Sequence, residues 1–148
     1  MTLALRHAAL GLALALACGL AAAQATPAGL WKTVDDSTKK EKSLVRIVES
    51  GGVYTGRVEK VIDPDSPKDA VCKDCTDDRK DKPVVGMTII RNMKASGDKD
   101  VFEGGDILDP NNGKVYRVRL RPEESGKQLE VRGYIGPFYR NQHWIRVE

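Results

Sequence analysis

The stretch Lys114-Val115-Tyr116-Arg117-Val118-Arg119-Leu120-Arg121 decides the fold class. Its residues Tyr116, Val118 and Leu120 occupy alternate positions, and an arginine follows each of them. A period of two is that of a β-strand with one face on a core and the other in water. A helix would instead repeat its apolar residues at intervals of three and four. The stretch therefore predicts a strand with one face buried against a core and the other exposed to solvent.

Most of the remaining chain alternates in the same way, with turn residues at short intervals. Leu129 and Val131 stand opposite Glu130 and Arg132, for example. Gly, Asn, Asp, Pro and Ser gather between such runs, because they tolerate positive φ or preset a turn. Strands are predicted over residues 29–34, 43–49, 53–62, 84–91, 100–107, 114–121, 127–134 and 142–147.

Eight strands joined mostly by short turns indicate an all-β fold, an antiparallel up-and-down meander. Such a sheet must hide its edges, and closing into a small barrel of about eight strands removes them. A two-sheet sandwich is the competing arrangement, since alternation alone does not exclude it. The stretch from Asp63 to Pro83 is longer than a turn, and a long loop in a compact domain is often functional or cross-linked.

The first 25 residues have the pattern of a secretion signal. They contain no acidic residue, Arg6 lies near the start, and an apolar run extends from Ala8 through Leu20. The run is shorter than the roughly 20 apolar residues of a membrane-spanning helix. Small residues then offer a cleavage position after Ala25 or, alternatively, after Ala23. We expect this signal to be removed and residues 26–148 to form one periplasmic or secreted domain.

A lipid anchor is the alternative for this segment. Cys18 follows Ala15-Leu16-Ala17, as an acceptor of acyl chains would. Ala15 stands where a larger aliphatic residue is expected, so release after Ala25 is the preferred interpretation.

The charge balance argues against nucleic acid as a partner. Lys and Arg number 24 against 21 Asp and Glu, which gives a formal net charge of +3. The basic residues are scattered among the acidic ones, whereas a nucleic-acid-binding protein shows a dominant basic face. Neither a membrane span in the mature domain nor a cofactor is expected.

The two ends of the predicted domain carry a paired motif. Gly29-Leu30-Trp31 lies in the first predicted strand, and Trp144-Ile145-Arg146 lies in the last. Together they resemble the signature of the calycin barrels, which include lipocalins. The resemblance implies that Arg146 lies across Trp31 and plugs one end of a barrel. A planar guanidinium stacks well on an indole ring and still donates hydrogen bonds. Trp31 as an ordinary core aromatic is the alternative.

A resemblance to one bacterial family covers almost the whole domain. Six blocks of the sequence carry it, and they begin at Gly29, Tyr54, Cys72, Lys82, Gly104 and Val131. In this order they resemble the exported family called domain of unknown function 2147, and the resemblance implies a small calycin-like barrel without an established activity. After Gly136 the chain reads Pro137-Phe138-Tyr139-Arg140 where the resemblance implies a Gly-rich tail, so the sequence does not fix the residue at which the last strand begins.

Cys72 and Cys75 form a C-x-x-C pair that fits a structural disulfide, a redox centre or half of a zinc site. Zinc needs four ligands, and beside this pair only His143 remains as a Cys or His after the signal, so no metal is expected. A redox centre needs a stabilised thiolate, whereas Asp74 and other acids lie nearby. In an oxidising compartment a disulfide is the ordinary outcome, and it is the preferred interpretation.

No arrangement typical of hydrolysis is evident, and the protein is expected not to be an enzyme. A nucleophile needs a base in reach, or two carboxylates must be positioned together. His143 falls on the strand face opposite Trp144, where a solvated role is usual. Asp106 and Asp109 lie among Gly and Pro residues, where turn hydrogen bonding is expected.

Arg117, Arg119 and Arg121 form the other conspicuous feature. Alternation places them on the solvent face if Val118 faces the core. In a barrel with a polar interior the faces would exchange, and the arginines would bind a carboxylate. They are therefore candidates for ligand contact.

The sequence thus predicts an exported barrel that binds one small, partly apolar ligand in its mouth or interior. Eight-stranded barrels can hold one small ligand or be filled by their own side chains. The alternative function is that of a non-catalytic envelope protein that binds another protein through its surface, with the 63–83 loop and the three arginines as the contact.

Overall fold

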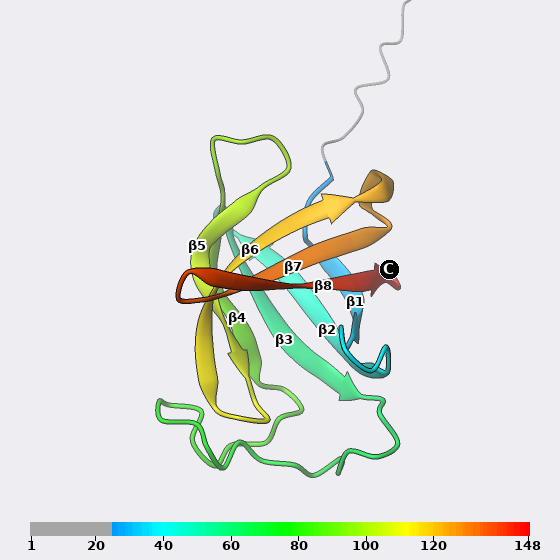
Figure 1. Cartoon of the computed structure of the whole chain (residues 1–148), viewed down its shortest axis with the longest axis vertical. Coiled ribbons are helices and arrows are strands. Elements are labelled where there is room, and N and C mark those ends of the chain that lie inside the picture. Colours follow the sequence, from blue (N-terminus) through cyan, green and yellow to red (C-terminus); the bar gives the residue numbers. More distant parts are fainter. Residues whose placement is uncertain (1–24) are drawn as a thin grey trace, which may run out of the picture.

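A computed structural model describes residues 25–148, and these form one closed barrel of eight antiparallel strands (Figure 1). Each strand pairs with the next along the chain, so the predicted meander is confirmed. Within residues 25–148 helical structure is limited to one 3-10 turn, η1 (Glu124–Gly126). The strands are β1 (Gly29–Val34), β2 (Glu41–Ser50), β3 (Val53–Val61), β4 (Thr88–Ala95), β5 (Phe102–Asp109), β6 (Lys114–Glu123), β7 (Gln128–Ile135) and β8 (Phe138–Arg146).

Pairing between β1 and β8 closes the barrel. Trp31 lies opposite Arg146, and Lys32 lies opposite Ile145. Closure removes the free edges that a two-sheet sandwich would keep, so the barrel is the arrangement of these strands.

Strands β4 and β8 begin at other residues than the alternation predicts. β4 begins at Thr88, after the predicted start at residue 84, because Gly86 lies in a turn and donates its N–H to the carbonyl of Val58. β8 begins at Phe138, ahead of residue 142, because the chain turns back within two residues. Gly136 has a φ of 57° in that turn, a conformation that Gly adopts without steric cost.

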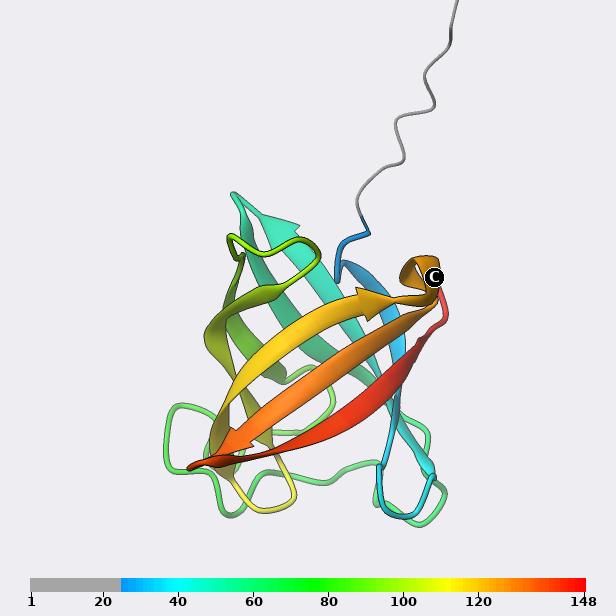
Figure 2. The same cartoon turned by 45° about the horizontal axis from the view of Figure 1, so that its top comes forward.

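The two ends of the barrel differ, and both can be followed in Figure 2. We call the base the end at which β1 begins and β8 ends. The mouth is the opposite end, where the connections β1–β2, β3–β4, β5–β6 and β7–β8 lie.

The core of the barrel is formed by apolar side chains. Burying one large apolar side chain stabilises a fold by roughly 1.5–3 kcal/mol. The interior contains side chains with almost no exposure, among them Trp31, Val45, Ile47, Ile90, Met93, Val118, Leu120 and Leu129.

The base is plugged by Arg146 and Trp31. The guanidinium carbon of Arg146 lies 4.1 Å from the centroid of the Trp31 ring. Trp31 donates its indole N–H to the carbonyl of Pro27 at 2.7 Å. Arg146 also donates to main-chain carbonyls, those of Thr26, Ala28 and Gly126.

Residues 62–87, which connect β3 to β4, run across the mouth end of the barrel (Figure 1). A disulfide joins Cys72 and Cys75, and both cysteines are buried. The adjacent Asp74 packs on the β5–β6 turn, where Gly113 has a φ of 70°. Any side chain at Gly113 would overlap the main-chain oxygen of Asp74, so Gly lets the loop and the hairpin touch.

The predicted secretion signal, residues 1–25, lies outside the described residues except for Ala25, as does Cys18. Among residues 25–148 there is no helix with the length and apolar character that a membrane crossing requires.

Candidate functional site

A pocket of about 290 Å³ opens at the mouth of the barrel. It lies between the β1–β2 and β5–β6 connections and the mouth halves of β7 and β8. This volume is near the lower end of the range for small-molecule sites, roughly 300–1,000 Å³. The apolar part of its wall includes Ile89, Leu108, Val131 and Trp144, and the polar part includes Asp35, Asp36, Lys42, Asp109, Tyr116, Arg140 and Gln142.

Gly133 on β7 contributes to the open space. It lies opposite Val118, which is buried in the barrel, and a β-carbon built on Gly133 meets no atom within 4 Å. The preceding residue on the same face, Val131, does carry a side chain into the core. A single residue without a side chain therefore leaves room at the mouth.

Arg140 and Asp36 form an ion pair across the mouth, between β8 and the β1–β2 turn. The Arg140 Nη2 lies 2.7 and 2.9 Å from the two carboxylate oxygens of Asp36, and Nε lies 3.1 Å from one of them. The carboxylate raises the pKa of Arg140 above its usual range, first through these hydrogen bonds and then through its charge. The pair connects two segments whose residues are 104 positions apart in the sequence.

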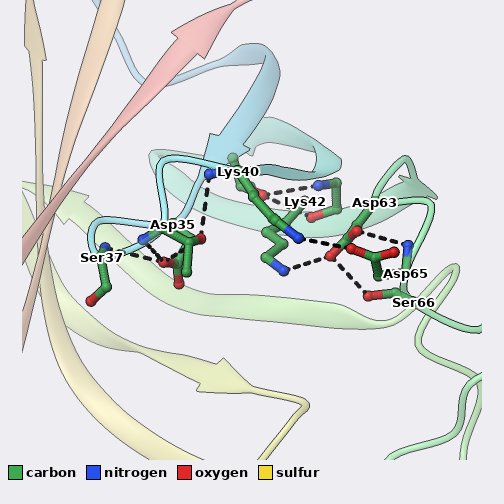
Figure 3. Close-up of polar contacts among 10 residues, drawn as sticks. Asp35, Ser37, Lys40, Lys42, Asp63, Asp65 and Ser66 are labelled. Carbon is green, nitrogen blue, oxygen red and sulfur yellow. Dashed lines mark hydrogen bonds and ion pairs between the residues drawn. The ribbon is translucent and has the colours of Figure 1, made fainter.

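Lys42 and Asp63 form a second ion pair beside the pocket (Figure 3). The Asp63 carboxylate is only 1% exposed and lies 2.5 Å from the Lys42 ammonium. It also accepts hydrogen bonds from the Asp65 N–H at 2.9 Å and the Ser66 hydroxyl at 3.2 Å. The hydrogen bond from Lys42, followed by that from Asp65, lowers the pKa of Asp63 to about 2. This carboxylate therefore fixes the start of the long loop to β2.

Asp35 is held in the β1–β2 turn by one of its oxygens. Oδ1 accepts the N–H groups of Ser37 and Thr38, at 3.1 and 2.6 Å, and the Thr38 hydroxyl at 2.8 Å (Figure 3). The Thr38 N–H and hydroxyl lower the pKa of Asp35, so this carboxyl stays ionised at neutral pH.

Asp109 is held similarly in the β5–β6 turn, where its Oδ1 accepts the N–H of Asn111 at 2.9 Å. This is the turn hydrogen bonding that the sequence predicts. Asp106 differs, because it lies within β5, opposite Arg91 on one side and Arg117 on the other. The expected turn hydrogen bonding of Asp106 is therefore wrong, because this residue lies inside the strand that the alternation predicted over residues 100–107.

Polar groups inside the mouth are paired with one another. The hydroxyls of Thr33 and Ser43 are 3.0 Å apart, and the Trp144 indole N–H donates to Gln142 Oε1 at 2.9 Å. Apolar walls with a few polar groups of this kind are typical of small-molecule pockets.

Arg117, Arg119 and Arg121 do not line the pocket. They lie on the strand face opposite buried Val118 and Leu120. Arg117 stacks over the ring of Tyr134 with its guanidinium carbon 4.5 Å from the centroid. The pocket therefore assigns none of the three arginines a contact with a ligand.

Glu130 is the partner of two of these arginines. It is 5% exposed, and Arg119 donates to it at 3.1 Å, while Arg121 and Arg132 each lie 3.6 Å away. Burial raises the pKa of Glu130, but the hydrogen bond from Arg119 and the charges of the other two arginines outweigh it, so the pKa is lowered overall. Arg119 and Arg121, together with Arg132 of β7, thus surround one buried carboxylate.

His143 belongs to the same cluster on the outside of the barrel. Its Nε2 lies 3.6 Å from a carboxylate oxygen of Glu123, and ligand atoms of His143, Glu123 and Glu130 all lie within 4.8 Å of one another. Three guanidinium groups already surround Glu130, so a metal cation would meet repulsion there. Sequence spacing did not reveal this cluster, because three separate segments supply it.

A second hollow, of about 460 Å³, lies on the outside of β2 and β3. It is lined by surface residues such as Val48 and Val85 and by the Arg46–Glu59 ion pair, whose atoms lie 2.7 Å apart. The mouth pocket combines buried apolar walls with a polar rim, and it is the candidate site.

Comparison with known proteins agrees with this architecture. A family model described as "Uncharacterized protein conserved in bacteria (DUF2147)" matches residues 29–146, which confirms the predicted family. A solved structure from the human pathogen Helicobacter pylori, protein HP1028, described as belonging to the lipocalin family, is similar with a TM-score of 0.71. The two chains are 20% identical, and the match covers 84% of each, so the likeness is one of fold. No curated protein matches the chain.

Proposed function

The chain belongs to the bacterial protein family DUF2147, and we propose that it binds one small, partly apolar molecule in the mouth of its barrel. The observation that carries the proposal is the pocket of about 290 Å³. Trp144 and Val131 lie in its wall together with polar rim residues. The apolar part of one ligand could therefore pack on the wall while its polar end binds the rim.

The size of the pocket restricts the ligand. The interior beyond the mouth contains fully buried side chains such as Trp31, Met93 and Leu120, and a long acyl chain would have to displace them. The proposed ligand is therefore much shorter than a fatty acid of a membrane lipid.

The proposal is for a binding protein and not for an enzyme. Among residues 25–148 the pocket lining includes no Cys and no His, and the Ser43 hydroxyl is paired with Thr33. A hydroxyl nucleophile needs a base within hydrogen-bond reach.

Filling the pocket tests the proposal. Gly133→Leu would place a side chain in the open space at the mouth, and Gly97→Leu is the matched control because it lies in the β4–β5 turn at the base, also with nothing within 4 Å. The probe is 1-hexanol, followed by the two indole N–H resonances in nuclear magnetic resonance spectra. Trp144 lines the pocket, whereas Trp31 lies at the base and serves as an internal reference.

We expect hexanol to shift the Trp144 resonance in the parent protein and in Gly97→Leu. In Gly133→Leu the affinity should fall more than about tenfold, because the added side chain occupies the space. Unchanged binding by Gly133→Leu would contradict the assignment of the site.

We further propose that the protein is exported and released after Ala25. The base plug uses main-chain carbonyls of Thr26, Pro27 and Ala28, so cleavage at this position leaves its contacts in place. Mass spectrometry of the mature protein should find Thr26 at the N-terminus. A diacylglycerol-modified Cys18 would instead demonstrate a lipid anchor.

A second candidate, binding of another protein, is favoured by the apolar tip of the β7–β8 hairpin. Phe138 is 74% exposed, and Tyr139 and Ile135 are 55% and 47% exposed. If this tip binds a partner in the cell envelope, Phe138→Ser would abolish the complex while hexanol binding stays unchanged.

A further inference from the structure

The two cationic side chains that line the mouth pocket are each paired with a carboxylate. Arg140 uses Nε and Nη2 to bind Asp36. Lys42 lies 2.5 Å from Asp63, which is almost fully buried. A ligand with a carboxylate or phosphate would have to compete with these internal carboxylates for the same cations.

Two carboxylates at the rim form no ion pair of this kind, and Asp35 interacts with the charge of Lys42 only at longer range. Among the residues that the structure describes, neither Asp35 nor Asp109 has a basic group within 4.0 Å, and both line the pocket. Their hydrogen bonds to the turns involve Oδ1 in each case. Oδ2 of each residue is thus left to interact with a ligand or with water.

The charge of the mouth is opposite in sign to that of the whole chain. Asp35, Asp36 and Asp109 line the pocket with three negative charges, against the two positive charges of Lys42 and Arg140, and Asp63 beside the pocket is already paired with Lys42. The whole chain has a formal net charge of +3. The local excess of carboxylates is therefore a property of the site and does not follow from the composition. Since apolar walls strengthen electrostatic interactions in a partly enclosed pocket, this excess favours a cation.

We infer that the pocket selects a small organic cation, a primary amine on a short apolar chain. The inference rests on the proposed function and adds the class of head group. The ammonium would lie between the rim carboxylates, and the chain would lie against Val131 and Trp144. Tyr116 also lines the pocket, and an aromatic ring can attract a cation to its face.

A metal ion fits the mouth less well than an organic cation. Within residues 25–148, the group of three or more potential ligands whose atoms lie within 4.8 Å of one another is the one at Glu130, on the outside of the barrel. The carboxylates of the mouth form no such group of three. An organic ammonium needs only one carboxylate at hydrogen-bond distance, because its other N–H groups can donate to water or to uncharged oxygens.

Three probes of equal chain length test the inference, namely hexylamine, 1-hexanol and hexanoate. The readout is again the Trp144 indole resonance, with Trp31 as the internal reference. Hexylamine should bind about tenfold more tightly than hexanol, and hexanoate should bind more weakly than either. Equal or tighter binding of hexanol or hexanoate would overturn the cation preference while leaving the proposed function intact. If none of the three shifts Trp144, both are wrong.

A second experiment removes the negative charge of one rim carboxylate at a time. Asp35→Asn and Asp109→Asn keep the oxygen that accepts the turn hydrogen bonds, so the turns should be retained. Each variant should weaken hexylamine binding about threefold and hexanol binding by a smaller factor, because the hydroxyl carries no charge. Asp98→Asn makes the same change in net charge in the β4–β5 turn at the base and should not affect either ligand. Amine binding that is unaffected by both rim variants contradicts the inference.

Discussion

Arg146 lies over the face of Trp31, with its guanidinium carbon 4.1 Å from the ring centroid. The stacked pair joins the first and last strands of the barrel, and the guanidinium binds main-chain carbonyls that strand pairing leaves free. Burial lowers the pKa of Arg146, yet an arginine keeps its charge because its ordinary value is so high. The base is therefore closed by one guanidinium group, which donates hydrogen bonds to main-chain carbonyls and covers the Trp31 ring.

Arg146→Lys should destabilise the barrel, because an ammonium cannot stack on Trp31 while reaching the same carbonyls. We expect the free energy of unfolding to fall by about 2 kcal/mol. Urea denaturation followed by circular dichroism measures it. Arg57→Lys, at an exposed position on β3, is the control and should change stability little. Equal stabilities of the two variants would show that Arg146 does not plug the base.

Replacing both cysteines should lower stability without unfolding the protein. Closing so short a loop contributes about 2 kcal/mol in the chain-entropy model, and this is the expected loss for Cys72→Ala with Cys75→Ala. The Ser pair should lose more, because the buried sites would hold unpaired hydroxyls. Denaturant titration of both pairs checks the order. A dithiol-exchange activity that vanishes in folded double variants would favour the redox interpretation.

Stability should fall in acid between about pH 4 and pH 2. The folded-state pKa of Asp63 is about 2, below its ordinary value of 3.8, and that of Asp77, bound by Arg79, is lowered to about 2 as well. A lowered pKa means that the contribution is complete above the unfolded value and is lost as the pH falls through the folded one. Melting temperatures between pH 2 and pH 7 measure this.

Asp63→Asn removes one of the two contributions. The variant should be less stable than the parent at pH 7, with a shallower decline between about pH 4 and 2. Parallel acid profiles for variant and parent would show that the Lys42 pair does not stabilise the fold.

Gly113→Ala should disturb the contact between the long loop and the β5–β6 turn. A β-carbon there overlaps the Asp74 main chain, and the φ of 70° is unfavourable for Ala. Gly52→Ala is the matched control, since Gly52 has a φ of 80° but nothing within 4 Å. We expect a loss of about 1 kcal/mol for Gly52→Ala and at least about twice that for Gly113→Ala. Thermal unfolding distinguishes the two, and equal losses would argue against the contact.

The alternation in the sequence predicted the barrel wall because each strand keeps one face on the core. Val118 and Leu120 are buried, and the intervening arginines lie on the other face. The Gly29-Leu30-Trp31 and Arg146 signature also pointed to the pair that plugs the base. Strand ends were less predictable, since β4 and β8 begin where local turns permit.

The pocket could not be predicted from the alternation of apolar and polar residues. Alternation places a residue on a face but does not show which end of the barrel it approaches or whether its neighbours fill the space. Gly133 looks like an ordinary strand residue until the opposing walls are known. The Arg140–Asp36 pair spans 104 positions, and nothing in local spacing indicates such a contact.

The residues at which β1 begins and β8 ends lie together at the base, and Leu30 donates its N–H to the carbonyl of Glu148 at 3.1 Å. A protein immobilised on a sensor chip, or fused to another domain, through either end of residues 25–148 is therefore attached on the side opposite the pocket. Its mouth points away from the support, and ligands reach it from bulk solution without passing the attachment point.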